Sequence, residues 1–313
     1  MNKLKTDVIC TDSNVYQPPI WNDLQAKSLS SSLFFELSNI FTTHIKKNFD
    51  KSKLYSSDSE VLISIAPDQH DMGFTSKDLN DLGYKKIIYI NDEPIYSNGA
   101  HSNAKKAHLD FLEEARVDVL YYCGNFDKKT SSARCVKKPW YSGLDLFFKK
   151  TTKDSKEFKI ITCANSINSW PDRNLFFQKF EKLDSGIDKK FCNNMSWAET
   201  SDLISSSKIY FSPPHALIVH WLRLLRCWHL GTLPVIFNTD GWLENDRIKE
   251  CYSDIIKENG KTCLLKNLSD FDEVVNNIKD EDYVNSILDN IYKKDLTEYS
   301  IQHTWDDLYH SLY

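Results

Sequence analysis

The sequence predicts a parallel α/β protein built from two Rossmann-like lobes. Short runs of β-branched and aromatic residues alternate along the chain with helical patterns of apolar residues, which is typical of parallel sheets covered by helices. The 313 residues exceed the usual size of one domain and are enough for two cores of about 150 residues each. The stretch from Lys208 to Phe237 has the pattern of a strand, a helix and a second strand joined by tight turns.

The expected elements follow one another in alternation. Strands are expected at Val61–Ala66, Lys86–Ile90, Val117–Tyr122, Phe158–Ala164, Lys208–Phe211, Leu233–Phe237 and Thr262–Leu265. Helices are expected at Asp23–Lys47, Ala100–Ala115, Arg173–Leu183, Ala198–Ser205, Ala216–Leu230, Phe271–Ile278, Asp282–Tyr292 and Ile301–Tyr313.

A polar run from Lys149 to Glu157 marks the expected boundary between the lobes, because its side chains are poorly suited to burial. We therefore divide the chain into an N-terminal lobe of residues 1–150 and a C-terminal lobe of residues 151–313. The last helix is a candidate to fold back across the cleft between the lobes.

Charge and composition exclude several classes of protein. The formal net charge is −5, with 39 basic and 44 acidic residues, which argues against a nucleic-acid-binding protein. No apolar run is long enough to cross a bilayer, and the first thirty residues lack the pattern of a leader peptide. The eight cysteines have no C-x-x-C spacing, so we expect reduced thiols in a cytoplasmic, metal-free protein.

The stretch from Lys208 to Phe237 has the features of a phosphate-binding unit. Ser212 is suited to cap the helix, Pro213 or Pro214 suits its first turn, and Gly231 suits a left-handed stop. A helix that begins beyond the carboxyl end of a strand points unpaired N–H groups at a bound phosphate. The alternative is an ordinary strand–helix–strand unit in which Arg223 is a surface charge.

A family resemblance favours the phosphate-binding interpretation. The run Val-His-x-x-Arg-Leu, which contains His220 and Arg223, is followed by Leu-Gly-x-x-Pro-Val ending at Val235. This pair resembles the donor-site signature of GT-B glycosyltransferases of the exostosin type. The resemblance implies a GT-B fold, with two Rossmann-like lobes and a cleft between them, and a nucleotide-sugar held near His220 and Arg223. It also implies that the N-terminal lobe receives the acceptor and that the C-terminal lobe binds the nucleotide-sugar.

Two further segments resemble bacterial α-1,3-fucosyltransferases, which also have the GT-B fold. Ile87–Pro94 is an apolar strand that ends in Asp92, Glu93 and a proline, and the resemblance makes Glu93 the catalytic base. The alternatives are that both carboxylates are solvated turn residues, or that His70 in the preceding loop is the base. In the second segment, Ile161–Phe177, the resemblance assigns the donor diphosphate to the turn at Asn165 and Ser166 and to Arg173.

The predicted mechanism needs no metal or bound cofactor. The leaving nucleotide diphosphate gains negative charge, and the forked guanidinium groups of Arg173 and Arg223 are suited to neutralise it. The chain departs from both families in one respect: the helix position expected to carry a glutamate is occupied by Leu222 or Arg226. Asp240 or Glu244 are candidates to replace that glutamate.

The predicted function is transfer of a sugar from a GDP- or UDP-linked donor to a glycan hydroxyl, in surface-polysaccharide or glycoconjugate synthesis. The missing helix glutamate leaves a catalytically inactive nucleotide- or sugar-binding protein as the alternative. A nucleotide-sugar epimerase is a second alternative, although the chain lacks the Gly-x-Gly-x-x-Gly turn of a tightly bound dinucleotide.

Overall fold

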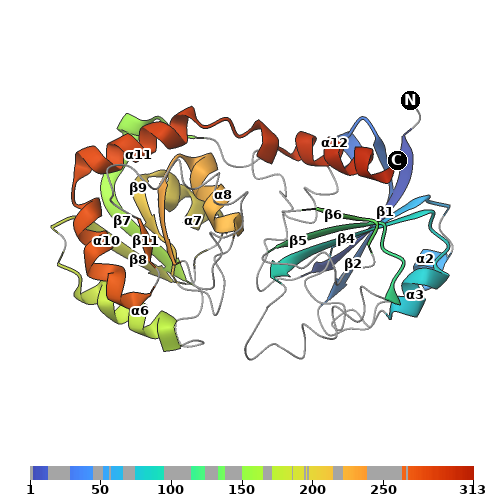
Figure 1. Ribbon diagram of the computed structural model, residues 1–313, viewed down its shortest axis with the longest axis horizontal. Coiled ribbons are helices and arrows are strands. Elements are labelled where there is room, and N and C mark those ends of the chain that lie inside the picture. The colour runs from blue at the N-terminus through green and yellow to red at the C-terminus, as the bar shows by residue number, and fades with distance from the viewer. Residues whose placement is uncertain are drawn as a thin grey trace. The chain divides into compact units, whose positions relative to one another are not determined.

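The computed structural model describes residues 3–12, 29–44, 52–55, 58–65, 75–94, 114–123, 133–137, 150–164, 171–184, 186–193, 195, 197–213, 221–237, 263–265 and 267–313. The chain forms two compact units: unit 1 is Met1–Gly143 with Thr297–Tyr313, and unit 2 is Leu144–Leu296. Each unit contains one parallel sheet (Figure 1). The division predicted after residue 150 kept the last helix in the second lobe, whereas in the structure this helix belongs to unit 1.

The sheet of unit 1 has the strand order β2-β1-β3-β4-β5-β6, and every pairing within it is parallel. Its strands are β1 (Leu4–Asp12), β2 (Phe35–His44), β3 (Val61–Ile65), β4 (Lys86–Pro94), β5 (Val119–Cys123) and β6 (Cys135–Lys137). The helices of this unit are α2 (Ser52–Tyr55), α3 (Ser76–Asp81) and α12 (Ile301–Leu312), with a 3-10 turn at Thr297–Tyr299.

The two faces of this sheet carry separate cores. Leu62 packs with Leu79 of α3 on one face, and Ile63 packs with Trp305 and Leu308 of α12 on the other, as the alternation of a strand requires (Figure 1). The Arg134 Nη2 atom also donates to the carbonyl of Leu312 at 3.1 Å. The C-terminal helix therefore completes the core of unit 1.

Three strands of unit 1 differ from the sequence prediction, which did not include the short β6. The predicted helix Asp23–Lys47 is wrong over Phe35–His44, which forms β2, and β1 was not predicted. In β1 the buried carboxylate of Asp7 accepts hydrogen bonds from Tyr84 Oη at 2.6 Å, Ser59 Oγ at 2.8 Å and Asn39 Nδ2 at 3.2 Å. These tertiary hydrogen bonds allow a polar residue inside a sheet and cannot be read from local pattern.

The sheet of unit 2 has the order β11-β10-β9-β7-β8, again with parallel pairing throughout. Its strands are β7 (Glu157–Ala164), β8 (Asp188–Asn193), β9 (Ser207–Phe211), β10 (Leu233–Phe237) and β11 (Leu264–Leu265). Its helices are α6 (Pro171–Lys182), α7 (Trp197–Ser205), α8 (Trp221–Leu230), α10 (Phe271–Ile278) and α11 (Glu281–Lys293), with 3-10 turns at Lys153–Ser155 and Leu268–Asp270.

Helices cover both faces of this sheet (Figure 1). Tyr210 of β9 belongs to a core with Cys227 and Leu230 of α8. The next residue, Phe211, points to the opposite face and lies 6.3 Å from Phe176 of α6, measured between ring centroids. The α8 and α6 helices therefore lie on opposite sides of the sheet.

Sequence pattern predicted most of unit 2. The strands β7, β9, β10 and β11 and the helices α6, α7, α8, α10 and α11 all lie within predicted segments or within a few residues of them. The strand β8 was missed because it is polar and lies at the sheet edge, where alternate residues are exposed. The predicted starts of α8 at Ala216 and of the helix at Ala100 lie outside the described residues.

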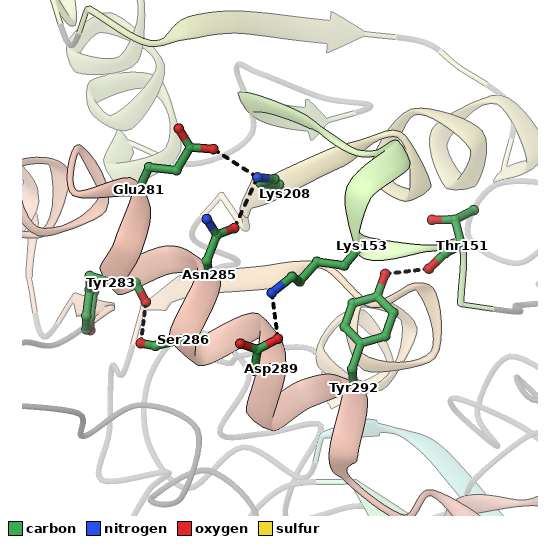
Figure 2. A network of polar contacts seen from close by, with 9 residues as sticks. All are labelled: Thr151, Lys153, Lys208, Glu281, Tyr283, Asn285, Ser286, Asp289 and Tyr292. Atoms are coloured by element: carbon green, nitrogen blue, oxygen red, sulfur yellow. Dashed lines mark hydrogen bonds and ion pairs between the residues drawn. The ribbon is translucent and has the colours of Figure 1, made fainter.

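Helix α11 fixes the beginning of unit 2 (Figure 2). The Lys153 ammonium lies 2.6 Å from Asp289, and the Tyr292 hydroxyl donates to the Thr151 carbonyl. Lys208 of β9 bonds both Glu281 at 2.9 Å and Asn285 at 3.0 Å on the same helix. The predicted boundary segment, from residue 150 to Glu157, is therefore held in the framework of unit 2.

The left-handed stop predicted at Gly231 is confirmed. Its φ is +70°, its N–H bonds the Trp228 carbonyl at 3.1 Å, and the Thr232 N–H bonds the Cys227 carbonyl at 2.8 Å. These two bonds form the Schellman motif that ends α8. A Cβ atom at Gly231 would lie 2.7 Å from the ring of Tyr292.

Gly231→Ala is expected to destabilise the protein by at least about 2 kcal/mol, because a left-handed backbone and a steric clash then act together. Urea unfolding measures this loss. Gly186→Ala is the matched control, since Gly186 also has a positive φ, of +68°, but nothing lies within 4 Å of the added atom. Equal losses at the two glycines would show that contact with Tyr292 has no energetic effect.

Candidate functional site

The strand order of unit 2 defines a switch point between β7 and β9. These strands are neighbours, yet β7 leads to α6 on one face of the sheet and β9 leads to α8 on the other. Ligands of open α/β sheets bind outside the carboxyl ends of the strands at such a point, because the two connections leave in opposite directions. We call the carboxyl ends of β7 and β9 the β7–β9 switch point.

Arg173 is held in the first turn of α6, which follows β7. Its side chain is only 4% exposed. It lies three, four and seven residues before Phe176, Phe177 and Phe180, so it shares the buried side of the helix with them. These rings fix the helix, since Phe180 also lies 6.2 Å from Phe211.

The position of Arg173 favours an anionic ligand. The first turn of a helix carries partial positive charge, which stabilises bound anions and disfavours cations. A buried arginine in this turn adds a second positive charge where the helix already has one. Such an arrangement is suited to a phosphate, which accepts hydrogen bonds from both the guanidinium and the helix N–H groups.

The remaining predicted donor-site residues lie in the sequence next to described elements of unit 2. Arg223 is the third described residue of α8, the helix that follows β9, but its side chain lies outside the described part of the chain. Asn165 and Ser166 directly follow β7, and His220 directly precedes the described part of α8. All three, together with Asp240 after β10, lie outside the described residues. The structure places the elements next to them in the sequence, which are β7, α8 and β10.

Arg226 is a buried cation that sequence reasoning noted only as the place of an absent glutamate. It is 5% exposed and lies three residues after Arg223 in α8. The spacing of the two arginines was the available signal. Arg226 joins the candidates for contact with an anionic ligand.

Glu93 lies where the pairing of β4 with β5 is irregular. Asn91 pairs with Tyr122 and Pro94 pairs with the next residue, Cys123, so Asp92 and Glu93 are additional residues in β4. Their side chains lie outside the description. Bulges re-aim side chains and are frequent beside active sites. They also break the alternation that would have placed Asp92 and Glu93 on opposite faces, so either carboxylate is a candidate base.

Lys156 lies at the other end of the sheet and has a lowered pKa. It precedes β7 and donates to the Ser205 carbonyl and, at 3.2 Å, to Thr232 Oγ1. Burial lowers its pKa to about 8. Because Lys156 lies at the amino end of β7, far along the strand from the switch point, we assign its hydrogen bonds to the framework.

His229 near the end of α8 is expected to make stability depend on pH. It is 5% exposed, and its Nε2 atom has no hydrogen-bond partner among the residues described. Burial, aided by the charge of Lys150, lowers its pKa from 6.5 to about 4. The unfolded chain therefore takes up a proton before the folded protein does, and stability present above pH 6.5 is lost as the pH falls toward 4.

The loss assigned to His229 is about 3 kcal/mol over this pH window. Urea unfolding of the wild type and of His229→Leu at several pH values gives the free energy of unfolding of each protein. The loss is the change with pH in the difference between these two free energies. His303→Ala is the control, because His303 is exposed on α12. A difference between wild type and His229→Leu that does not change with pH would contradict the assignment.

Within the described ranges, no three His, Cys, Asp or Glu side chains gather as a metal site would require. Among the helices that the structure describes, none has the length and apolarity needed to cross a bilayer.

Comparison with known proteins identifies the fold. No protein-family model and no curated protein sequence matches the chain. Among solved structures, a HepE protein of Anabaena in complex with UDP-glucose is 9% identical, with a TM-score of 0.62 and 99% coverage of both chains. The lipopolysaccharide outer core galactosyltransferase WaaB is 12% identical, with a TM-score of 0.58 and coverage of 98% of this chain and 99% of that one.

A UDP-GlcNAc 2-epimerase from Neisseria meningitidis bound to UDP-GlcNAc is 8% identical, with a TM-score of 0.55 and 99% coverage of both chains. Together with the two parallel α/β units, these similarities show that the chain has the GT-B fold. The structural neighbours include glycosyltransferases and proteins solved with UDP-sugars. At such low identity, the similarity establishes the fold alone.

Proposed function

We propose that this chain is a glycosyltransferase that moves a sugar from a nucleotide-sugar donor to a hydroxyl group of a glycan acceptor. The observation that carries the proposal is the buried Arg173 in the first turn of α6, at the β7–β9 switch point. An anion-binding helix terminus with a guanidinium beside it is suited to the diphosphate of such a donor.

The leaving diphosphate is the chemical centre of the proposal. Breaking the glycosidic bond to the nucleotide places negative charge on the diphosphate, and preorganised cations stabilise that charge in the transition state. Arg173 and Arg223 supply the cations, and the turn at Asn165 and Ser166 supplies further hydrogen bonds. His220 and Asp240 are assigned to the rest of the donor.

UDP is the first donor nucleotide to test, because solved structures with this fold contain UDP-sugars. GDP is the second, on the resemblance of the Ile161–Phe177 segment to the fucosyltransferases. The same resemblance, with that of the exostosin-type helix, supports a role in surface-polysaccharide or glycoconjugate synthesis.

The acceptor hydroxyl needs a base in an inverting reaction. The carboxylates of Asp92 and Glu93 at the β4 bulge are assigned this role, with Glu93 first because the fucosyltransferase-like segment matches there. The assignment is a proposal for unit 1, as the diphosphate site is for unit 2.

Epimerisation of a nucleotide-sugar is the second candidate, because a UDP-GlcNAc 2-epimerase shares the fold. Both kinds of enzyme bind the diphosphate of a nucleotide-sugar, but only the transferase moves the sugar to an acceptor. An inactive binding protein is the third outcome, and the absent acid at Leu222 and Arg226 keeps it open.

A panel of UDP- and GDP-sugars with glycan acceptors separates these functions. We expect acceptor-dependent release of free nucleotide from one donor and a product heavier by one sugar. Conversion of the donor to its epimer, without acceptor dependence, would replace transfer by epimerisation. Saturable nucleotide binding without turnover of any donor would indicate the binding protein.

A further inference from the structure

Two cysteines lie side by side near the β7–β9 switch point. Cys163 of β7 and Cys192 of β8 are register partners in the parallel pairing of these strands, and both belong to the same core cluster. Each is one residue from the carboxyl end of its strand. Both are reduced, with exposures of 8% and 6%.

The strand geometry is compatible with a bond between them. Neighbouring strands lie about 4.7–4.9 Å apart, within the roughly 4.4–6.8 Å range of Cα separations that disulfides span. Because both side chains enter one core cluster, they stand on the same face of the sheet. We propose that Cys163 and Cys192 are a redox pair that closes reversibly to an intramolecular disulfide at the carboxyl edge of the unit 2 sheet.

Hydrogen peroxide is the oxidant by which the pair closes. One thiolate attacks a peroxide oxygen, the O–O bond breaks, and a sulfenic acid and hydroxide form. The second thiolate attacks the sulfenic sulfur and displaces hydroxide, which forms the S–S bond. With the two thiol protons, the sum is two thiols and one peroxide giving one disulfide and two waters, and two electrons pass from sulfur to oxygen.

The other described buried thiols are placed differently. Cys227 belongs to the same cluster, but it lies on α8 and is fully buried. Cys263 is also fully buried, and burial raises its pKa to about 12, which suppresses the reactive thiolate. Cys163 and Cys192 differ from both by lying on adjacent strands, each one residue from the carboxyl end of its strand.

The disulfide is expected to be readily reduced. Side chains of register partners on parallel strands start farther apart than the Cβ separation of about 3.8 Å that a relaxed disulfide has. A bridge between them is therefore strained, and strained disulfides are the labile and regulatory ones. Treatment with dithiothreitol should restore both thiols.

The bridge also bears on the donor site, and this step rests on the proposed function. Cys163 lies two residues before Asn165, in the turn assigned to the diphosphate. Drawing the ends of β7 and β8 together displaces the start of that turn. We expect the oxidised protein to bind UDP at least several-fold more weakly than the reduced protein.

Peptide mapping of the full chain tests the pair. After titration with hydrogen peroxide and alkylation of remaining thiols, trypsin should yield the peptides 160–173 and 191–208 joined by a disulfide. Dithiothreitol should separate them, and Cys163→Ala and Cys192→Ala should each abolish the joined species. Cys227→Ala is the matched control and should leave it unchanged.

The proposal would be overturned if Cys163 and Cys192 of the wild type were still recovered as alkylated thiols in peptides 160–173 and 191–208 at every peroxide concentration below the one that aggregates the protein. This holds whatever the variants do. Joining of either peptide to a different cysteine would overturn it equally. This mapping does not depend on the enzyme's activity. A protein that forms the bridge but does not bind UDP would contradict the proposed function and leave the redox pair intact.

Discussion

Glu93→Gln is expected to lower kcat by roughly a hundred- to ten-thousand-fold, the usual contribution of a general base. The amide keeps the shape of the side chain but cannot accept the proton of the acceptor hydroxyl at neutral pH. Affinity for the donor should stay within about twofold, because the diphosphate site is assigned to unit 2. Initial rates at saturating donor and acceptor measure kcat, and titration with UDP measures the affinity.

Asp92→Asn is the matched comparison, since both carboxylates lie in the β4 bulge. A large loss at Asp92 alone would move the base by one residue, which the broken alternation of the strand permits. If neither substitution affected kcat while His70→Ala abolished turnover, the base would lie in the loop after β3. Harmless substitutions at all three residues would favour a retaining reaction, which needs no such base.

Arg173→Ala is expected to weaken UDP binding by roughly 10- to 150-fold, equivalent to the loss of about 1.5–3 kcal/mol for a charge-assisted contact. Isothermal titration with UDP measures it, and the thermal midpoint without ligand checks that the fold survives. Lys182→Ala, at the exposed last turn of the same helix, is the control and should bind UDP as the wild type does.

Arg223→Ala should behave like Arg173→Ala if both guanidinium groups bind one diphosphate. The double variant should then lose less than the sum of the single losses, since contacts to a shared ligand are not independent. Full additivity would place the two arginines on separate ligands or on separate parts of the donor. Unchanged UDP affinity in both single variants would remove the diphosphate from the β7–β9 switch point.

Sequence pattern correctly predicted the elements in which buried residues recur regularly. It failed where tertiary contacts determine the secondary structure. The strand β10 is a continuous apolar run between Gly231 and the next loop, and its assignment is confirmed. Phe34, just before β2, and Leu37 and Phe41 within it are spaced like a helical repeat, and only pairing with β1 makes the segment a strand. The strand β8 lies at the sheet edge, where polar residues are tolerated, and its polar sequence therefore did not indicate a strand.

Prediction of the site residues also failed where tertiary contacts decide the outcome. The sequence singled out Arg173, but its neighbours in the chain did not indicate that its side chain would be buried on the aromatic side of α6. The bulge at Asp92 and Glu93 arises from pairing with β5, a tertiary contact that local sequence pattern does not contain. The return of α12 to the core of unit 1 depends on packing of Trp305 and Leu308 against strands some two hundred residues away.

The most direct measurement of the central claim is a crystal structure of the protein with UDP bound. The account predicts the diphosphate outside the carboxyl ends of β7 and β9, within hydrogen-bond distance of the Arg173 guanidinium and of N–H groups in the first turn of α6. A diphosphate bound elsewhere, such as at the carboxyl ends of the strands of unit 1, would contradict it.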